Sequence, residues 1–239
     1  MPYTGLLQQL PADRRRFRLL LLMVGLTLYG LSDAMLVQAG LGLDPWDVLH
    51  QGLSRSVGGQ VGTWTDIIGV LVLLGWIPLR QKPGVGTVIN VIVIGIVINV
   101  CLAVLPSPHG WQLQTVEMVS AVLLNAVATG LYIGAGLGPG PRDGLMTGIA
   151  GRGHSVRVVR TGIELSVLAI GWLLGGTVGV GTVVYALAIG PLVHLTLPLL
   201  TLGSRLNDPL QPGGEGGQQQ SVEVGPAARA GAQLVSRED

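Results

Sequence analysis

The sequence is poor in charge, in aromatic side chains and in cysteine. Charged residues fill 11% of its 239 positions and aromatic residues 4%, with a single phenylalanine. A soluble globular domain carries about 25% charged residues, so this composition excludes an ordinary soluble protein. The one cysteine, Cys101, excludes a disulfide and a cysteine-based metal site within one chain.

The sequence also lacks the motifs of several large enzyme classes. There is no Walker phosphate loop, no GxSxG and no HExxH, and no pair of histidines or cysteines stands at metal-ligand spacing. The basic residues flank apolar segments and form no patch, which argues against nucleic-acid binding. We therefore expect no enzymatic activity, no metal and no cofactor.

Apolar residues and glycine, in contrast, are abundant. Hydrophobic residues make up 49% of the chain and glycine accounts for 38 positions, with a mean hydropathy of +0.58. A helix needs about 20 apolar residues to cross a bilayer core, and six segments approach that length. The sequence therefore predicts an all-α membrane protein with transmembrane helices at 19–38, 64–79, 85–105, 114–137, 158–175 and 180–202.

The positions of the basic residues predict the orientation of these helices. If residues 1–18 form a basic cytoplasmic N-terminus, 13 of the 14 lysines and arginines lie on the cytoplasmic side and only Arg55 lies outside. The positive-inside rule favours this arrangement. We expect a multi-pass membrane protein with both termini in the cytoplasm. Residues 203–239, rich in glycine, proline, glutamine and alanine, predict a disordered cytoplasmic tail.

The chain contains an internal duplication. The stretch AGLGLDPWDVLHQGL at 39–53 returns 96 residues later as AGLGPGPRDGLMTGI at 135–149. Each copy, membrane repeat 1 at 19–105 and membrane repeat 2 at 114–202, contains three predicted spans. Because three is an odd number, the second repeat should be inverted relative to the first. Inverted repeats build many secondary transporters, whose solute sites lie between the two repeats.

The most similar part of the two repeats is a Gly/Pro turn followed by a short helix, predicted at about 45–56 and 141–151. These helices are too short to span and should be re-entrant or interfacial. In the first copy, Asp44 is placed to cap the helix ahead of a proline at its first position. The acids in the first turns either contribute to a solute site or only stabilise their own helices. The first site candidates are thus Pro45, Asp47, Pro141 and Asp143.

Other polar residues fall within the predicted spans, where an ionisable group is a functional hypothesis by default. Asp33 and Asp66 lie near the outer ends of their spans, where snorkelling lowers the cost of a charge. Glu164 follows Arg160 by the spacing of a helical ion pair. A further polar set lies at matching depths of the third and sixth spans, as interhelical hydrogen bonds or as a pathway lining: Asn90, Asn99, Tyr185 and His194.

The stretches GLGLDPWD and GLGPGPRDGLM, the Gly-Trp pair ending the next span and the VGTV opening the following one resemble the YczE/YyaS/YitT-type bacterial membrane proteins. The resemblance covers about residues 15–205 and implies a multi-pass protein of the bacterial cell membrane, that is, of the plasma membrane. It implies no particular activity. The YitT branch usually carries a soluble C-terminal domain, and the low-complexity tail found here makes the chain more similar to the YczE branch.

Two functions fit these observations. The leading hypothesis is a small secondary transporter or exporter of an unidentified solute or ion, embedded in the lipid bilayer and compatible with a homodimer. The alternative is a non-transporting accessory protein that stabilises or regulates a membrane partner. A water-accessible cavity bounded by both Gly/Pro turns would favour transport, whereas a dry, closed bundle would favour the accessory role.

Overall fold

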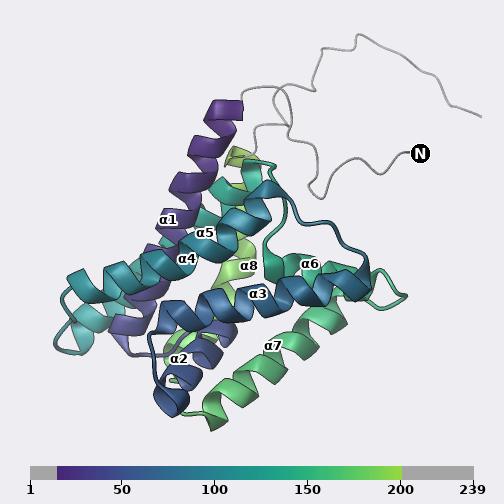
Figure 1. Cartoon of the computed structure of the whole chain (residues 1–239). Helices are drawn as coiled ribbons and strands as arrows, with labels where there is room; N and C mark the ends of the chain where they lie inside the picture. The colour runs from purple at the N-terminus through teal and green to yellow at the C-terminus, as the bar shows by residue number, and fades with distance from the viewer. Residues whose placement is uncertain (1–14, 201–239) are drawn as a thin grey trace, which may run out of the picture. The chain divides into compact units, whose positions relative to one another are not determined.

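The structure, a computed structural model, describes residues 15–200, and these form eight helices without a strand (Figure 1). The predicted all-α class is confirmed over this range. Most of the basic N-terminal segment and the predicted tail 203–239 lie outside the described residues. The helices are α1 (Arg15–Ala39), α2 (Pro45–Val57), α3 (Val61–Leu79), α4 (Val85–Val104), α5 (Trp111–Gly134), α6 (Pro141–Ala150), α7 (Val156–Leu173) and α8 (Val180–Leu200).

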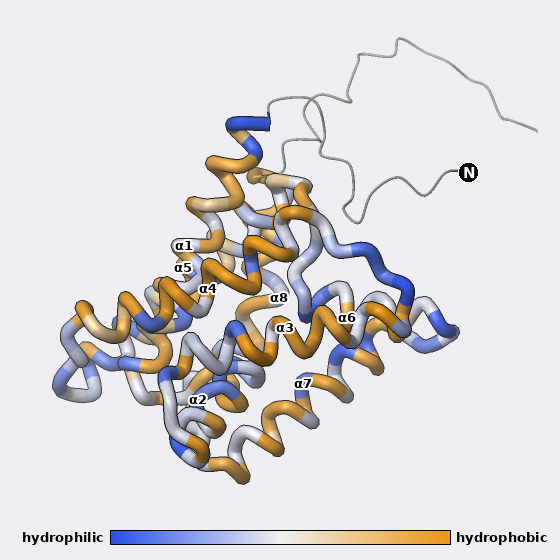
Figure 2. The backbone as a smooth tube through the Cα atoms, in the orientation of Figure 1, coloured by the Kyte–Doolittle hydropathy of each residue, from blue (hydrophilic) through white to orange (hydrophobic). Residues whose placement is uncertain are grey.

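Five of these helices, α1, α3, α4, α5 and α8, have the length and apolar composition needed to cross a membrane. Figure 2 shows their mainly hydrophobic character, and α4 has the highest mean hydropathy of the five. Large apolar side chains on their outer faces are exposed, as lipid-facing residues would be, among them Leu71, Ile96 and Leu187. The predicted span at 158–175 corresponds to α7, which carries three charged residues and is not among the five. The count of six spans therefore stays a prediction.

Both short helices begin where the sequence predicts. The Asp44 side chain accepts a hydrogen bond from the Asp47 backbone N–H at 2.8 Å, and Pro45 occupies the first turn of α2. This is the cap chemistry that satisfies an otherwise orphaned N–H. Helix α6 also has proline in its first turn, but its cap residue, Gly140, has no side chain with which to close the helix end.

The Gly/Pro turns before the two short helices have the same backbone geometry. Gly40 and Gly136 have φ angles of 67° and 66°, and Gly42 and Gly138 have φ angles of 122° and 129°. Such positive angles strain any residue with a Cβ, so glycine is required at these four places. The duplicated sequence thus folds twice into one local shape.

Each turn is held by the other repeat. The Gly86 N–H at the start of α4 donates to the Leu137 carbonyl at 2.8 Å, and the Gly181 N–H at the start of α8 donates to the Leu41 carbonyl at 2.8 Å. These donors occupy equivalent places in the two VGTV segments, and the acceptors occupy equivalent places in the two turns. The repeats are therefore interlocked through a reciprocal pair of hydrogen bonds.

The helices of the two repeats also pack on one another in equivalent pairs. Helices α1 and α5 pack along each other, α1 also packs on α4 and α5 on α8. Helix α2 packs on α7 of the second repeat, and α6 packs on α3 of the first. One equivalent pair departs from this pattern, because α3 packs closely along α4 whereas α7 and α8 have no comparable contact.

Two equivalent glycines show how different these pairs are. A methyl group at Gly95 of α4 would overlap the Asp66 side chain and the Gly62 backbone of α3. At Gly190 of α8 it would meet no atom of the described chain within 4 Å. The Gly62 N–H also donates to the Asn99 side-chain oxygen at 2.8 Å. Helices α3 and α4 are thus in backbone contact, while α7 and α8 are apart.

Candidate solute-binding site

A cavity of about 520 Å³ lies where the two repeats meet. Small-molecule sites typically have volumes of about 300–1,000 Å³, so the cavity has the size of a ligand pocket. Both Pro45 and Pro141 line it, so the first turns of α2 and α6 bound the same space. Arg160 and Glu164 of α7 also line it and are 55% and 32% exposed, so the cavity reaches the surface there. Their predicted ion pair is confirmed at 2.9 Å.

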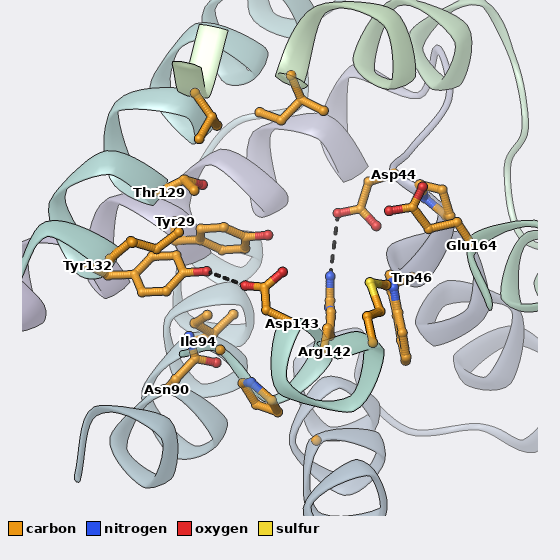
Figure 3. A pocket seen from close by; sticks show the side chains of 18 of the residues that line it. Tyr29, Asp44, Trp46, Asn90, Ile94, Thr129, Tyr132, Arg142, Asp143 and Glu164 are labelled. Carbon is orange, nitrogen blue, oxygen red and sulfur yellow. Dashed lines mark hydrogen bonds and ion pairs between the residues drawn. The ribbon is translucent and has the colours of Figure 1, made fainter. Parts of the chain in front are cut away.

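Arg142, in the first turn of α6, occupies the centre of the site (Figure 3). Its guanidinium carbon lies 5.0 Å from the centre of the Trp46 ring, a cation–π distance. Its Nη1 atom lies 3.8 Å from Asp44 Oδ2, and its Nη2 atom lies 3.9 Å from Asp47 Oδ1. These are ion pairs longer than hydrogen bonds. Burial opposes the charge of Arg142, but the acids around it raise its pKa above the ordinary value.

The acids beside Arg142 are perturbed in the opposite sense. Burial raises the pKa of Asp44 to about 6, reinforced by the neighbouring Asp47 and opposed by Arg142. Burial likewise raises the pKa of Asp47 to about 6. His50 Nδ1 lies 3.0 Å from Asp47 Oδ1 and 3.1 Å from the Thr65 hydroxyl. Burial lowers the pKa of His50 to about 3, so the imidazole is neutral at pH 7.

A buried hydrogen-bond network links α1, α5 and α8 next to this cluster. The Asn125 amide donates to Asp33 Oδ1 at 3.0 Å and to the Ser32 hydroxyl at 2.9 Å. The Tyr185 hydroxyl donates to Asn125 Oδ1 at 3.0 Å. Asp33 is fully buried, so the expectation that it snorkels toward the membrane surface is wrong. It lies on the face of α1 that packs against α5, where Asn125 replaces water as its partner.

Asp143 is held by a different helix. The Tyr132 hydroxyl of α5 donates to Asp143 Oδ2 at 3.2 Å, as Figure 3 shows. The Tyr132 ring meets Tyr29 of α1 edge-on, with centroids 5.9 Å apart. Asp143 therefore contributes a carboxylate to the cavity wall besides the favourable charge it places at the start of α6.

The structure divides the residues selected from the sequence into three groups. Asp33 and Asp47 lie behind the cavity wall, in the acidic cluster with Asp44. Asp66 and Asn99 lie at the contact between α3 and α4 and do not line the cavity. Seven candidates line the cavity: Pro45, Asn90, Pro141, Asp143, Glu164, Tyr185 and His194.

Several important residues were not selected from the sequence. Arg142 was counted only among the cytoplasmic basic residues, and Asp44 was expected only to cap its helix. The signal for Arg142 lies in the duplication, where it occupies the place of Trp46 between a proline and an aspartate. Four further residues that the selection missed belong to the cavity wall or the network behind it: Tyr29, His50, Asn125 and Tyr132.

These features define a multi-pass α-helical membrane protein with a polar cavity between two similar halves. Residues 16–198 match the family of unknown function DUF6198, and the chain belongs to this family. This agrees with the YczE-type resemblance of the duplicated motifs.

The relatives of the chain are membrane or uncharacterised proteins. It is 39% identical over 181 residues to an uncharacterised protein of Haemophilus influenzae, covering 75% of this chain and 83% of that protein. It is 37% identical over 161 residues to the uncharacterised membrane protein YczE of Bacillus subtilis, covering 66% and 74%. It is 27% identical over 184 residues to the uncharacterised protein YyaS of the same organism, covering 74% and 90%. No solved structure matches the chain.

Proposed function

We propose that the chain is a small secondary transporter that moves a small polar solute across the bacterial cell membrane. The observation that carries the proposal is the cavity bounded by the first turns of both short helices, between the two repeats. Transporters built from inverted repeats bind their solutes at such a place, with broken or short helices directed at the site. We assign no chemical reaction to the chain.

The cavity wall suits a polar solute with apolar parts. Tyr29, Trp46 and Tyr132 supply aromatic surface, while Arg142 and Asp143 supply charges of opposite sign. Ligand sites commonly combine an apolar wall with a few converging polar groups that orient the ligand. This combination, and the opening beside α7, support solute binding over a purely structural bundle.

The difference in packing between the α3–α4 pair and the α7–α8 pair supports an alternating-access mechanism. With the N-terminus in the cytoplasm, the contact between Gly62 and Gly95 closes the outer side, and the separation of α7 from α8 opens the cavity toward the cytoplasm. In an inverted repeat, the two pairs exchange roles when the protein changes state. The outward-open state would have α3 separated from α4 and α7 packed on α8 around Gly190.

Ligand binding by the purified protein tests the transport proposal. A library of small polar metabolites is screened for compounds that raise the unfolding temperature in detergent, since a ligand of the folded state stabilises it by mass action. We expect at least one binder, and its uptake into proteoliposomes should exceed that of empty liposomes. A complete absence of binders, or binding without uptake, would favour the accessory role.

Reporter fusions test the inverted arrangement separately. A fusion after residue 110, between α4 and α5, should report the outer side, and a fusion after residue 150, at the end of α6, should report the cytoplasm. Reports from one and the same side would contradict the inverted repeats and the access mechanism built on them.

A further inference from the structure

Three carboxylates from α1 and the start of α2 converge behind the cavity wall. Asp33, Asp44 and Asp47 are buried, with exposed fractions of 0%, 2% and 0%. Each offers one carboxylate oxygen, and these atoms all lie within 4.8 Å of one another. Asp44 also lines the cavity, so the cluster adjoins the space in which a solute would bind.

In each of these carboxylates one oxygen has a hydrogen-bond partner and the other has none among the described residues. Asp33 Oδ1 accepts a hydrogen bond from the Asn125 amide, and Asp44 Oδ1 accepts one from the Asp47 backbone N–H. Asp47 Oδ1 is hydrogen-bonded to His50 Nδ1. Within residues 15–200, the Oδ2 atoms of all three are buried without a hydrogen-bond partner. A buried carboxylate oxygen that accepts no hydrogen bond is costly, so three such oxygens in adjacent groups indicate a ligand that bonds to oxygen.

The charges around the cluster indicate the sign of that ligand. Arg142 forms ion pairs with two of these acids, at 3.8 Å from Asp44 and 3.9 Å from Asp47. One guanidinium balances one of three carboxylates. Besides Arg142, the side chains that contact the three acids are Asn125, which is uncharged, and His50. A cation would therefore complete the site.

We propose that Asp33, Asp44 and Asp47 form a binding site for a hard metal cation, either Na⁺ or a divalent ion such as Ca²⁺ or Mg²⁺. Hard cations take oxygen ligands, with Ca²⁺–O distances of about 2.3–2.6 Å. An ion at the centre of three oxygens separated by at most 4.8 Å lies about 2.8 Å or less from each, so small closing movements give this coordination. Binding of the ion stands by itself, and its use to drive solute movement rests on the proposed function.

The site was not expected from the sequence, which predicted no metal. No histidine or cysteine spacing indicated a metal site, and Asp33 belongs to α1 whereas the other two acids lie at the start of α2. Asp44 and Asp47 belong to the Gly/Pro turn and the first turn of α2, and α6 brings Arg142 beside them. A metal ion there would link the first repeat's short helix to α1 and, through Asn125, to α5.

Metal-dependent unfolding of the full chain in detergent tests the site. The protein is freed of metal with a chelator, and Na⁺, Ca²⁺, Mg²⁺ or Mn²⁺ is added at constant ionic strength, with choline as the control cation. We expect a saturating rise of Tm with at least one metal and none with choline. The separate arms show whether the ion is monovalent or divalent. Absence of any metal-specific rise, together with no binding of radioactive Na⁺ or Ca²⁺, would overturn the proposal.

Variants locate the binding. Asp33→Asn and Asp47→Asn keep the side-chain shape and should each abolish the metal-dependent rise. Glu117→Gln, which removes an acid on α5 away from the cluster, should keep it. If an asparagine variant does not fold, radioactive-ion binding to Asp44→Asn takes its place. A rise of the same size in folded cluster variants would overturn the assignment.

The two proposals fail separately. Metal binding without any solute binder would leave the cation site and remove its coupling role. A transported solute whose uptake is independent of the metal would leave the transport function and remove the coupling ion.

Discussion

Arg142 stacks on Trp46, with its guanidinium carbon 5.0 Å from the centre of the indole ring. The two residues are 96 positions apart and occupy the same place in the two repeats, between a proline and an aspartate. Each belongs to the first turn of a short helix, so their contact is the point where the starts of α2 and α6 meet. At this point the repeats differ in charge, because Arg142 stands where the first repeat has Trp46 and Gly140 stands where it has Asp44, which makes the site asymmetric.

Replacing Arg142 tests its role as the partner of the buried acids. Arg142→Ala leaves Asp44 and Asp47 without their cation and should lower stability in metal-free buffer by about 2 kcal/mol. This is less than the roughly 3–5 kcal/mol of a fully buried pair, because Arg142 is 23% exposed. Unfolding by SDS titration measures the loss. Trp46→Leu keeps the acids paired but removes the stacking, worth about 0.5–1 kcal/mol, and part of a buried ring, so it should cost more than the stacking alone. A variant Arg142→Ala as stable as the parent chain would contradict the ion-pair role.

The equivalent glycines of α4 and α8 offer a matched pair of substitutions. Gly95→Ala places a methyl group against α3 and should lower stability by about 1–3 kcal/mol, the cost of overpacking. Gly190→Ala meets open space and should leave stability unchanged or raise it by up to about 1 kcal/mol, since alanine favours helix over glycine. Equal effects in the same unfolding assay would contradict the difference between the two helix pairs.

Thiol labelling tests the side from which the cavity opens. In a Cys101→Ser background, Glu164→Cys should react with a membrane-impermeant thiol reagent presented at the cytoplasmic face. Asn99→Cys, held against Gly62 at the closed pair, should resist the same reagent presented outside. A solute that drives the exchange of states should reverse this pattern. Rapid outside labelling of Asn99→Cys in the absence of solute would contradict a closed outer side.

The Asn125 network gives a graded prediction. Tyr185→Phe removes one interhelical hydrogen bond and should cost about 0.6 kcal/mol, the average in a membrane protein. Asn125→Ala deprives both Asp33 and Tyr185 of a buried partner, and each unsatisfied group costs about 1–3 kcal/mol. The second substitution should therefore be clearly the more destabilising in SDS unfolding. Similar costs for the two would show that Asp33 does not depend on Asn125.

Much of the secondary structure follows from local signals. Hydropathy marked the long helices to within a few residues of their ends, as for α4, predicted at 85–105 and found at Val85–Val104. Proline and the Asp44 cap fixed the start of α2, because capping depends only on neighbouring residues. The position of each side chain around its helix depends on partners far along the chain. Asp33 was therefore misplaced, since its environment is set by Asn125 of α5, 92 residues later.

The site was only partly predictable for the same reason. The duplication indicated both Gly/Pro turns, because a repeated sequence repeats its fold, and both turns line the cavity. The charge of Arg142 was read as a membrane-surface signal, since its pairing with Asp44 arises only when the first turns of α2 and α6 meet. A comparison of the two copies residue by residue finds Arg142 opposite Trp46, whereas no spacing in the sequence brings Asp33 to Asp44.

The reciprocal bonds of Leu41 and Leu137 make neither half of the chain complete by itself. The first half needs Gly181 to satisfy its turn, and the second half needs Gly86. Cutting the connection between α4 and α5 would separate two fragments that each have an acceptor and a donor left for the other. In this respect the chain resembles a dimer of two similar halves that have been joined covalently. Because each half is present only once, Arg142, Trp46 and the acids could differ between the two halves.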